Sequence, residues 1–211
     1  MDQQREGTGR FLKWAILVVV IILAVVSFWI MVERPSFDAD KVAQAETRMW
    51  QAYYSGDKTQ LGLQLIALLR NQHGLSLLEA KEIGELLASS AMKFRSANGD
   101  YESVALPDLS KAYGLIKRAT GAPFDPGRVA RAELAWWVAR RTQGQNSAEQ
   151  VGKRIAELYA LLYGRDRPAF EKAGLLRAQA AEVRDSGGKN SDWVYVEDLL
   201  RKSYRELKNG I

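Results

Sequence analysis

Residues that could carry out acid–base or metal chemistry are scarce in this chain of 211 residues. It has one histidine, His73, and no cysteine. The lack of cysteine excludes disulfides, cysteine-ligated zinc, haem attachment through a Cys-x-x-Cys-His motif and a thiol nucleophile. A single histidine also argues against a histidine-rich metal site and against a serine–histidine relay. We therefore expect no cofactor and no metal, and we expect His73, which precedes Gly74, to be a helix C-terminal residue favoured by the helix dipole.

Glu102 is the sharpest candidate for a catalytic residue. It opens the segment Glu102–Pro107, which has a serine directly after the glutamate and is followed by Ser110–Ile116 and then by Asp125–Pro126. This arrangement resembles the lytic transglycosylases, helical envelope enzymes that cleave peptidoglycan. The resemblance implies that Glu102 serves as general acid and then as general base. That role requires a partly desolvated carboxyl with a raised pKa.

The same segment departs from the transglycosylase motif in several places. Two residues are missing between Ser103 and the later Gly-Leu pair, Ala105 stands where an aromatic is expected, and Lys117 replaces a glutamine. Glu102 also follows Gly99–Tyr101, a segment typical of a turn before a helix that Pro107 would start. We therefore favour a solvated turn glutamate and keep glycan cleavage through Glu102 as the alternative.

The pair Trp136–Trp137 is the best candidate for binding a partner. Adjacent residues of a helix point about 100° apart, so both rings are covered only where the helix is enclosed on two sides. Trp136 continues the apolar stripe of its helix, and we expect it in the core. Trp137 lies close to Arg140 and Arg141, and tryptophan and arginine are enriched in binding hot spots. We predict these three as partner-binding residues. The alternative is a central core helix that buries both rings.

The elements that position these residues begin with a long apolar segment. Residues 14–32 contain no charge over 19 positions, and a helix of that length covers about 28 Å, close to the ~30 Å of a bilayer core. Trp14 and Trp29 stand near its ends, where indole rings favour the headgroup level. The alternatives are a buried core helix and a cleaved signal peptide. The run exceeds the usual apolar region of a signal, about 7–15 residues, and its exit has no small-residue cleavage site. We predict a retained signal anchor.

The charges that flank the anchor predict its orientation. Three basic residues lie within residues 1–13, and the positive-inside rule places that short segment in the cytoplasm. Residues 33–40 would then form a linker, and residues 41–211 a domain across the membrane, in the periplasm if the cell is bacterial. The weaker alternative inverts this topology and leaves the domain in the cytoplasm.

Apolar residues recur at helical spacing throughout residues 41–211. Capping boxes at Ser76–Glu79 and Ser147–Gln150 mark two helix starts, and no alternating strand pattern competes. The chain is therefore predicted to be all-α, with about eight short helices packed as antiparallel hairpins beyond the anchor. Gly99–Glu102 is similar to the inter-helix turn of tetratricopeptide repeats, although the residues that should follow at repeat spacing are missing, so the array is tetratricopeptide-like at most.

Composition narrows the class of function. The 30 basic and 25 acidic residues are mixed along the chain, which is typical of a solvated surface and not of a nucleic-acid binder. We expect a single-pass protein of the cell membrane, bacterial inner membrane in our reading. Its helical domain would bind other membrane or envelope proteins as an accessory, assembly or scaffold subunit. Its other contact would be the bilayer, through residues 14–32.

Overall fold

The structure, a computed structural model, describes the backbone of residues 3–211 and the side chains from Lys13 onwards. The segment predicted to be cytoplasmic is residues 1–13, and the side chains of its first twelve residues lie outside the described part of the chain. Within the described range the chain forms nine α-helices and two short 3-10 helices, without any strand, which confirms the all-α prediction. The elements are α1 (Gln3–Val32), α2 (Ala39–Ser55), α3 (Lys58–His73), α4 (Leu77–Ser96), α5 (Tyr101–Thr120), α6 (Pro126–Arg141), α7 (Ala148–Tyr163), η1 (Arg167–Phe170), α8 (Glu171–Gly187), η2 (Gly188–Asn190) and α9 (Trp193–Gly210).

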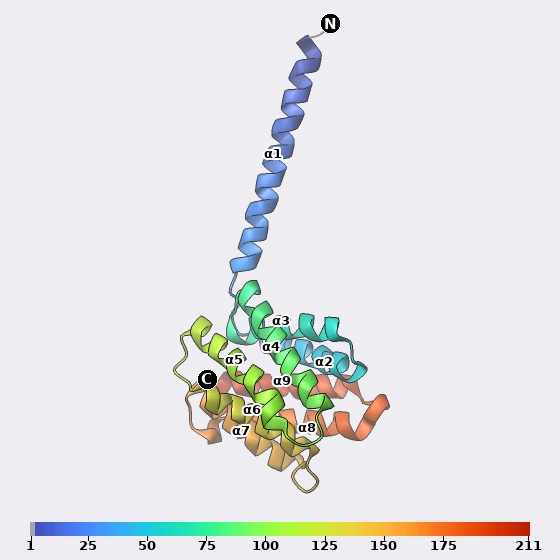
Figure 1. The fold of residues 1–211 in the computed structure, drawn as a ribbon, viewed down its shortest axis with the longest axis vertical. Helices are drawn as coiled ribbons and strands as arrows, with labels where there is room; N and C mark the ends of the chain where they lie inside the picture. The colour runs from blue at the N-terminus through green and yellow to red at the C-terminus, as the bar shows by residue number, and fades with distance from the viewer. Residues whose placement is uncertain (1–2) are drawn as a thin grey trace.

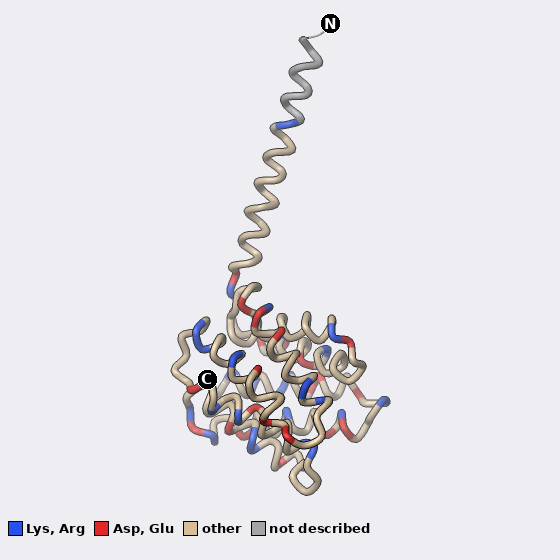
Figure 2. Tube along the Cα trace, viewed as in Figure 1, with Lys and Arg blue, Asp and Glu red and all other residues tan. Residues whose placement is uncertain are grey.

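Helix α1 extends away from the rest of the molecule (Figure 1). Its segment Lys13–Val32 is the one stretch of the described chain that is long and apolar enough to cross a membrane, and none of it is buried. Figure 2 shows no charged residue between Lys13 and the end of the helix. The alternative of a buried core helix is therefore wrong, because a core helix would be covered by its neighbours.

The junction between α1 and the domain is fixed by polar contacts. Arg34 pairs with Glu79 at 2.5 Å and donates to the carbonyl oxygens of Gly74, at 3.3 Å, and Ala119, at 3.4 Å. These acceptors lie around the ends of α3, α4 and α5. The predicted linker, residues 33–40, is thus held against the domain and is short, because α2 already begins at Ala39.

Helices α2 to α9 form a closed ring. Each helix packs against the next one along the chain, and α9 also packs against α2. Consecutive helices therefore run in opposite directions. One end of the ring holds four connections: α2 to α3, α4 to α5, α6 to α7 and α8 to α9 (Figure 1). The hairpin packing agrees with the prediction, whereas the closure by α9 was not indicated by the sequence.

Local signals in the sequence explain where most helices begin. Ser76 and Glu79 form the predicted capping box of α4, and Ser147 caps α7 by accepting from the Gln150 amide. Helices α7 and α8 approach each other closely at Gly152 and Gly174. A Cβ at Gly174 would lie 2.4 Å from the Gly152 carbonyl oxygen, so only glycine permits this packing distance.

Helix α5 begins earlier than the sequence suggested. The Asp100 side chain caps it by accepting from the Ser103 amide, and the helix runs from Tyr101, with Pro107 inside it. Proline has no N–H, so the helix loses one hydrogen bond at Pro107 but continues. The placement of Glu102 in a turn is therefore wrong. It belongs to the first turn of α5, although it is solvent-exposed as expected.

A buried polar cluster joins the two ends of the ring. Glu46 of α2 is fully buried and accepts from Arg177 of α8, with Nε at 2.9 Å and Nη2 at 2.5 Å. The hydroxyl of Tyr204 on α9 donates to the other oxygen of Glu46 at 2.6 Å. Arg177 Nη1 also reaches the hydroxyl of Tyr159 on α7 at 3.4 Å. Four helices thus meet at one carboxylate and one guanidinium.

Candidate binding cavity

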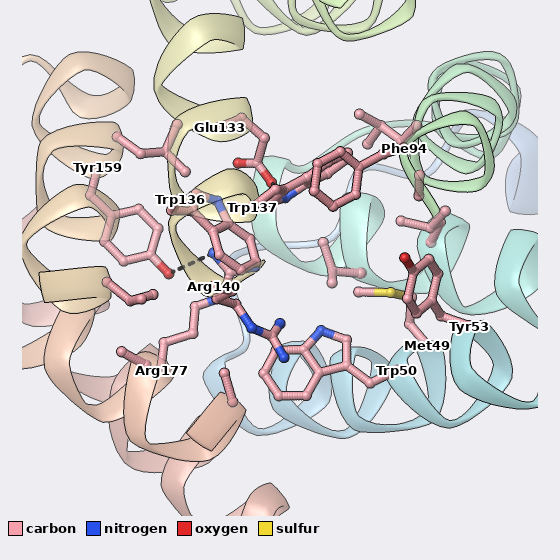
Figure 3. A pocket seen from close by; sticks show the side chains of 18 of the residues that line it. Met49, Trp50, Tyr53, Phe94, Glu133, Trp136, Trp137, Arg140, Tyr159 and Arg177 are labelled. Carbon is pink, nitrogen blue, oxygen red and sulfur yellow. Dashed lines mark hydrogen bonds between the residues drawn. The ribbon is translucent and has the colours of Figure 1, made fainter. Parts of the chain in front are cut away.

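The ring encloses a cavity of about 880 Å³ that opens to solvent. Residues from each of the helices α2 to α8 line it, and aromatic and aliphatic side chains predominate. Figure 3 shows Trp50, Tyr53, Phe94, Trp136 and Trp137 around this space, together with a few charged side chains. Binding sites for small organic molecules commonly have volumes of about 300–1,000 Å³ and this kind of lining.

The three predicted partner-binding residues all line this cavity. Trp137 is half-buried, and its indole N–H donates to Oε1 of Glu133 at 2.9 Å. Trp137 and Arg140 thus face the interior of the ring, and Arg141 lines the cavity from a solvent-exposed position. Trp136, expected in the core, is 4% exposed and does lie in the core cluster.

Arg140 ties α6 to α2 and α8. Its Nη2 lies 2.8 Å from Oδ2 of Asp185 and 3.0 Å from the hydroxyl of Tyr54. The guanidinium also stands over the rings of Trp50, at 5.4 Å, and Trp136, at 5.8 Å. Burial alone would lower the pKa of Arg140, but Tyr54 and Asp185 together raise it. Its charge is therefore compensated within the protein.

Arg141 lies at the opening of the cavity and has neutral partners. It donates to the carbonyl oxygen of Phe94 at 2.8 Å and to the hydroxyl of Tyr53 at 3.2 Å. Arg95 donates to the backbone carbonyl of Tyr53 from the other side. These arginines meet the C-terminal ends of α2 and α4, where the helix dipoles favour positive charge. We call the three of these residues that line the cavity, Tyr53, Phe94 and Arg141, the mouth of the cavity.

Glu133 is a cavity residue that sequence reasoning missed. Its side chain is buried, with 9% of the residue exposed, and it accepts from the hydroxyl of Tyr113 at 3.0 Å and from Trp137. Burial raises the pKa of Glu133, while Arg177 and the hydrogen-bond donors partly oppose this shift. A signal was present, because Glu133 follows Val129 by four residues and precedes Trp136 by three, on the apolar stripe.

His73 differs from its expected state. It lies at the end of α3, as predicted, but burial lowers its pKa to about 4. The ring is therefore neutral at pH 7 and gains nothing from the helix dipole as a cation. His73 lines the cavity beside Gln72, away from the mouth. Across the described residues, no cluster of three histidine, aspartate or glutamate side chains could hold a metal ion.

The other predicted site residues lie outside the cavity. Glu102 is exposed at the start of α5 and does not line the space. Trp14 and Trp29 are 65% and 66% exposed near opposite ends of the apolar part of α1, and their place at the headgroups stays a prediction. They form no single site with the cavity residues.

The cavity is suited to binding, because polar groups held in place by hydrogen bonds, such as Glu133 with Tyr113 and Trp137, lie within a largely apolar and aromatic lining. No protein-family model, curated protein or solved structure matches this chain. The geometry of the ring therefore carries the functional argument.

Proposed function

We propose that this chain is a membrane-anchored binding protein that works as an accessory, assembly or scaffold subunit of a membrane or envelope complex. Helix α1 is the anchor, and the ring receives part of another membrane or envelope protein at its cavity. The main support for this proposal is that one solvent-accessible cavity is lined by Trp137, Arg140 and Arg141. Tryptophan and arginine are the residue types most enriched in binding hot spots.

The junction at Arg34 supports a tethered role. The contacts of Arg34 with Glu79, Gly74 and Ala119 fix the ring close to the end of the apolar helix. A ring held at the bilayer meets other membrane proteins at a raised effective concentration. The anchor thus contributes to binding without contacting the partner.

Capture of partners from detergent-solubilised membranes tests this proposal. The substitution Ala91→Trp adds a large side chain to a half-buried position that lines the cavity, and Ala169→Trp adds the same side chain at an exposed position outside it. We expect the full-length wild type and Ala169→Trp to retain the same set of membrane proteins, and Ala91→Trp to lose it. Circular dichroism must show that both variants stay helical. Equal capture by Ala91→Trp would refute the cavity as the binding site.

We further propose that the N-terminus is cytoplasmic and the ring periplasmic, in the inner membrane of a bacterium. The three basic residues within residues 1–13, ahead of the apolar segment of α1, support this orientation. The lack of cysteine makes the test simple, because Asn209→Cys introduces one exposed thiol on α9. A maleimide that cannot cross the inner membrane should label this thiol in spheroplasts before lysis. Labelling only after lysis would mean the inverted topology.

The alternative of peptidoglycan cleavage through Glu102 gains no support. A general acid of that kind needs a desolvated carboxyl, whereas Glu102 is exposed on the first turn of α5. It also lies outside the cavity that would have to hold a glycan.

A further inference from the structure

The cavity contains a buried carboxylate without a cationic partner. Within the part of the chain that the structure describes, no lysine, arginine or histidine nitrogen lies within 4 Å of the Glu133 oxygens. Its two donors, Tyr113 and Trp137, are both neutral. Arg177 acts on Glu133 electrostatically, but its guanidinium already pairs with Glu46. The two carboxylates, Glu46 and Glu133, and the one guanidinium, Arg177, therefore carry a net charge of −1 together.

The charge at the mouth does not balance Glu133. Arg141 has no carboxylate partner among the described residues, yet it is exposed, so water screens its charge. A buried carboxylate, in contrast, remains costly unless it is paired or protonated. The uncompensated group that matters most for a ligand is thus the buried one, and it is negative.

The surroundings of Glu133 also suit a positive group. The rings of Trp136, Trp137, Tyr113 and Tyr159 line the same cavity, and the faces of aromatic rings attract cations. One such cation–π contact is already present, because the guanidinium of Arg177 lies 4.9 Å from the centre of the Trp136 ring. Beyond these rings, aliphatic side chains such as Leu65 and Leu69 provide room for an apolar body.

We infer that the cavity binds an ammonium group on an apolar body, with the ammonium against Glu133 and the apolar part among the leucines. This inference rests on the cavity being the binding site under the proposed function. Two sources offer this chemistry, namely a free amphipathic amine and a lysine side chain of the partner protein. The ammonium supplies the charge that the cluster of Glu46, Arg177 and Glu133 lacks.

Three soluble probes that share one body test the choice of head group. These are 4-phenylbutylamine, 4-phenyl-1-butanol and 4-phenylbutyrate, titrated against the full-length protein in nonionic detergent and followed by tryptophan fluorescence. Both probes can donate to Glu133, but only the ammonium neutralises its buried charge, so we expect the amine to bind roughly tenfold or more tightly than the alcohol. The carboxylate probe should bind most weakly.

Glu133→Gln is the decisive variant, because glutamine has nearly the same shape. Its oxygen can still accept from the Trp137 indole, and its amide nitrogen can donate to the Tyr113 hydroxyl, which is able to accept. It should abolish the preference for the amine and leave binding of the alcohol unchanged. Glu182→Gln is the matched control, since Glu182 lines the cavity but is exposed. It should keep the preference. Partition of the probes into the micelles is the same for all three proteins.

Capture of partners separates the two sources. If the partner provides a lysine, Glu133→Gln should lose the captured proteins that Glu182→Gln retains. Selective amine binding with unchanged capture would indicate a free amine. The inference is overturned if Glu133→Gln changes neither measurement, or if its amine preference equals that of the wild type. Capture that Ala91→Trp abolishes and Glu133→Gln preserves, without amine selectivity, would refute this inference while the proposed function stands.

Discussion

Two carboxylates of the ring, Glu46 and Glu133, are both buried but differ in what surrounds them. Glu46 receives two hydrogen bonds from Arg177 and one from Tyr204, so its charge is neutralised and its oxygens are occupied. Glu133 receives one hydrogen bond each from Tyr113 and Trp137, and no cation pairs with it in the described chain. Both sites desolvate a carboxylate, but only that of Glu46 is compensated.

This difference separates a structural cluster from a candidate binding site. The Glu46 cluster joins α2, α7, α8 and α9, and thereby closes the ring. The Glu133 cluster lies on α5 and α6 and faces the cavity. A group whose interactions are complete stabilises the fold, whereas a buried group with an incomplete set can gain the missing interaction from a ligand.

The largest effect is expected from Arg177→Met, which leaves Glu46 buried without its cation. Removing one partner of a buried ion pair typically destabilises a protein by about 3–5 kcal/mol. Urea unfolding of the detergent-solubilised protein, followed by circular dichroism, measures this loss. The double variant Glu46→Gln/Arg177→Met is the control and should recover part of the stability. A loss below about 1 kcal/mol for Arg177→Met would mean that the cluster does not close the ring.

Both Trp136 and Trp137 line the cavity, and a comparison of Trp136→Ala with Trp137→Ala tests which of the two rings the core depends on. Trp136 is 4% exposed, and truncating a buried tryptophan typically removes about 3–5 kcal/mol. Trp137 is half-buried and holds Glu133 by one hydrogen bond, so its loss should be smaller, about 2 kcal/mol. Only Trp137→Ala should weaken partner capture while the protein remains folded. Equal and severe destabilisation by both substitutions would make the pair simply core.

Glu133→Gln should alter how stability depends on pH. Burial raises the pKa of Glu133 in the folded state, so the protonated form is favoured by folding. That contribution is complete below the unfolded pKa, about 4.3, and is lost as the pH rises through the folded value. The wild type should therefore lose stability relative to Glu133→Gln between pH 4 and pH 7, by less than the two preceding effects.

The control for this pH effect lies in the groups that the two proteins share. Arg177 and Tyr113 do not titrate in this range, because their pKa values are raised well above their usual ones. His73, whose pKa is about 4, titrates equally in both proteins and cancels in the difference. Unfolding free energies at pH 4, 5.5 and 7 give the measurement. A difference between the two proteins that does not change with pH would contradict the prediction.

The sequence predicted those parts of the fold that depend on neighbouring residues. The capping signals at Ser76 and Ser147 are local, and both mark helix starts found in the structure. The closure of the ring depends on Glu46 and Arg177, which lie 131 residues apart, so no periodicity could indicate it. Asp100 is the local cap signal of α5, whereas Pro107, a residue typical of a first helical turn, lies inside the helix.

The candidate site was predicted in part. Residue types and spacing selected Trp137, Arg140 and Arg141, but helical spacing defines a face only relative to its own helix. Whether that face points outward or into the ring depends on how the other helices pack, and here it points inward. Glu133 was missed because a glutamate in an apolar stripe is usually assigned to solvent, although its place between Val129 and Trp136 favours burial.

The smallest effect is expected from Glu102→Gln. Glu102 is exposed in the first turn of α5, where an acidic side chain gains only a few tenths of a kcal/mol from the helix dipole. Surface changes of this kind usually alter stability by less than about 0.5 kcal/mol. Because Glu102 does not line the cavity, the variant should also complement a deletion strain and capture the same proteins as the wild type. A variant that folds and reaches the membrane but behaves as a null would transfer the functional site from Glu133 to Glu102. Release of muropeptides by the purified full-length protein would then decide for the glycan-cleaving alternative, because the binding role requires no such activity.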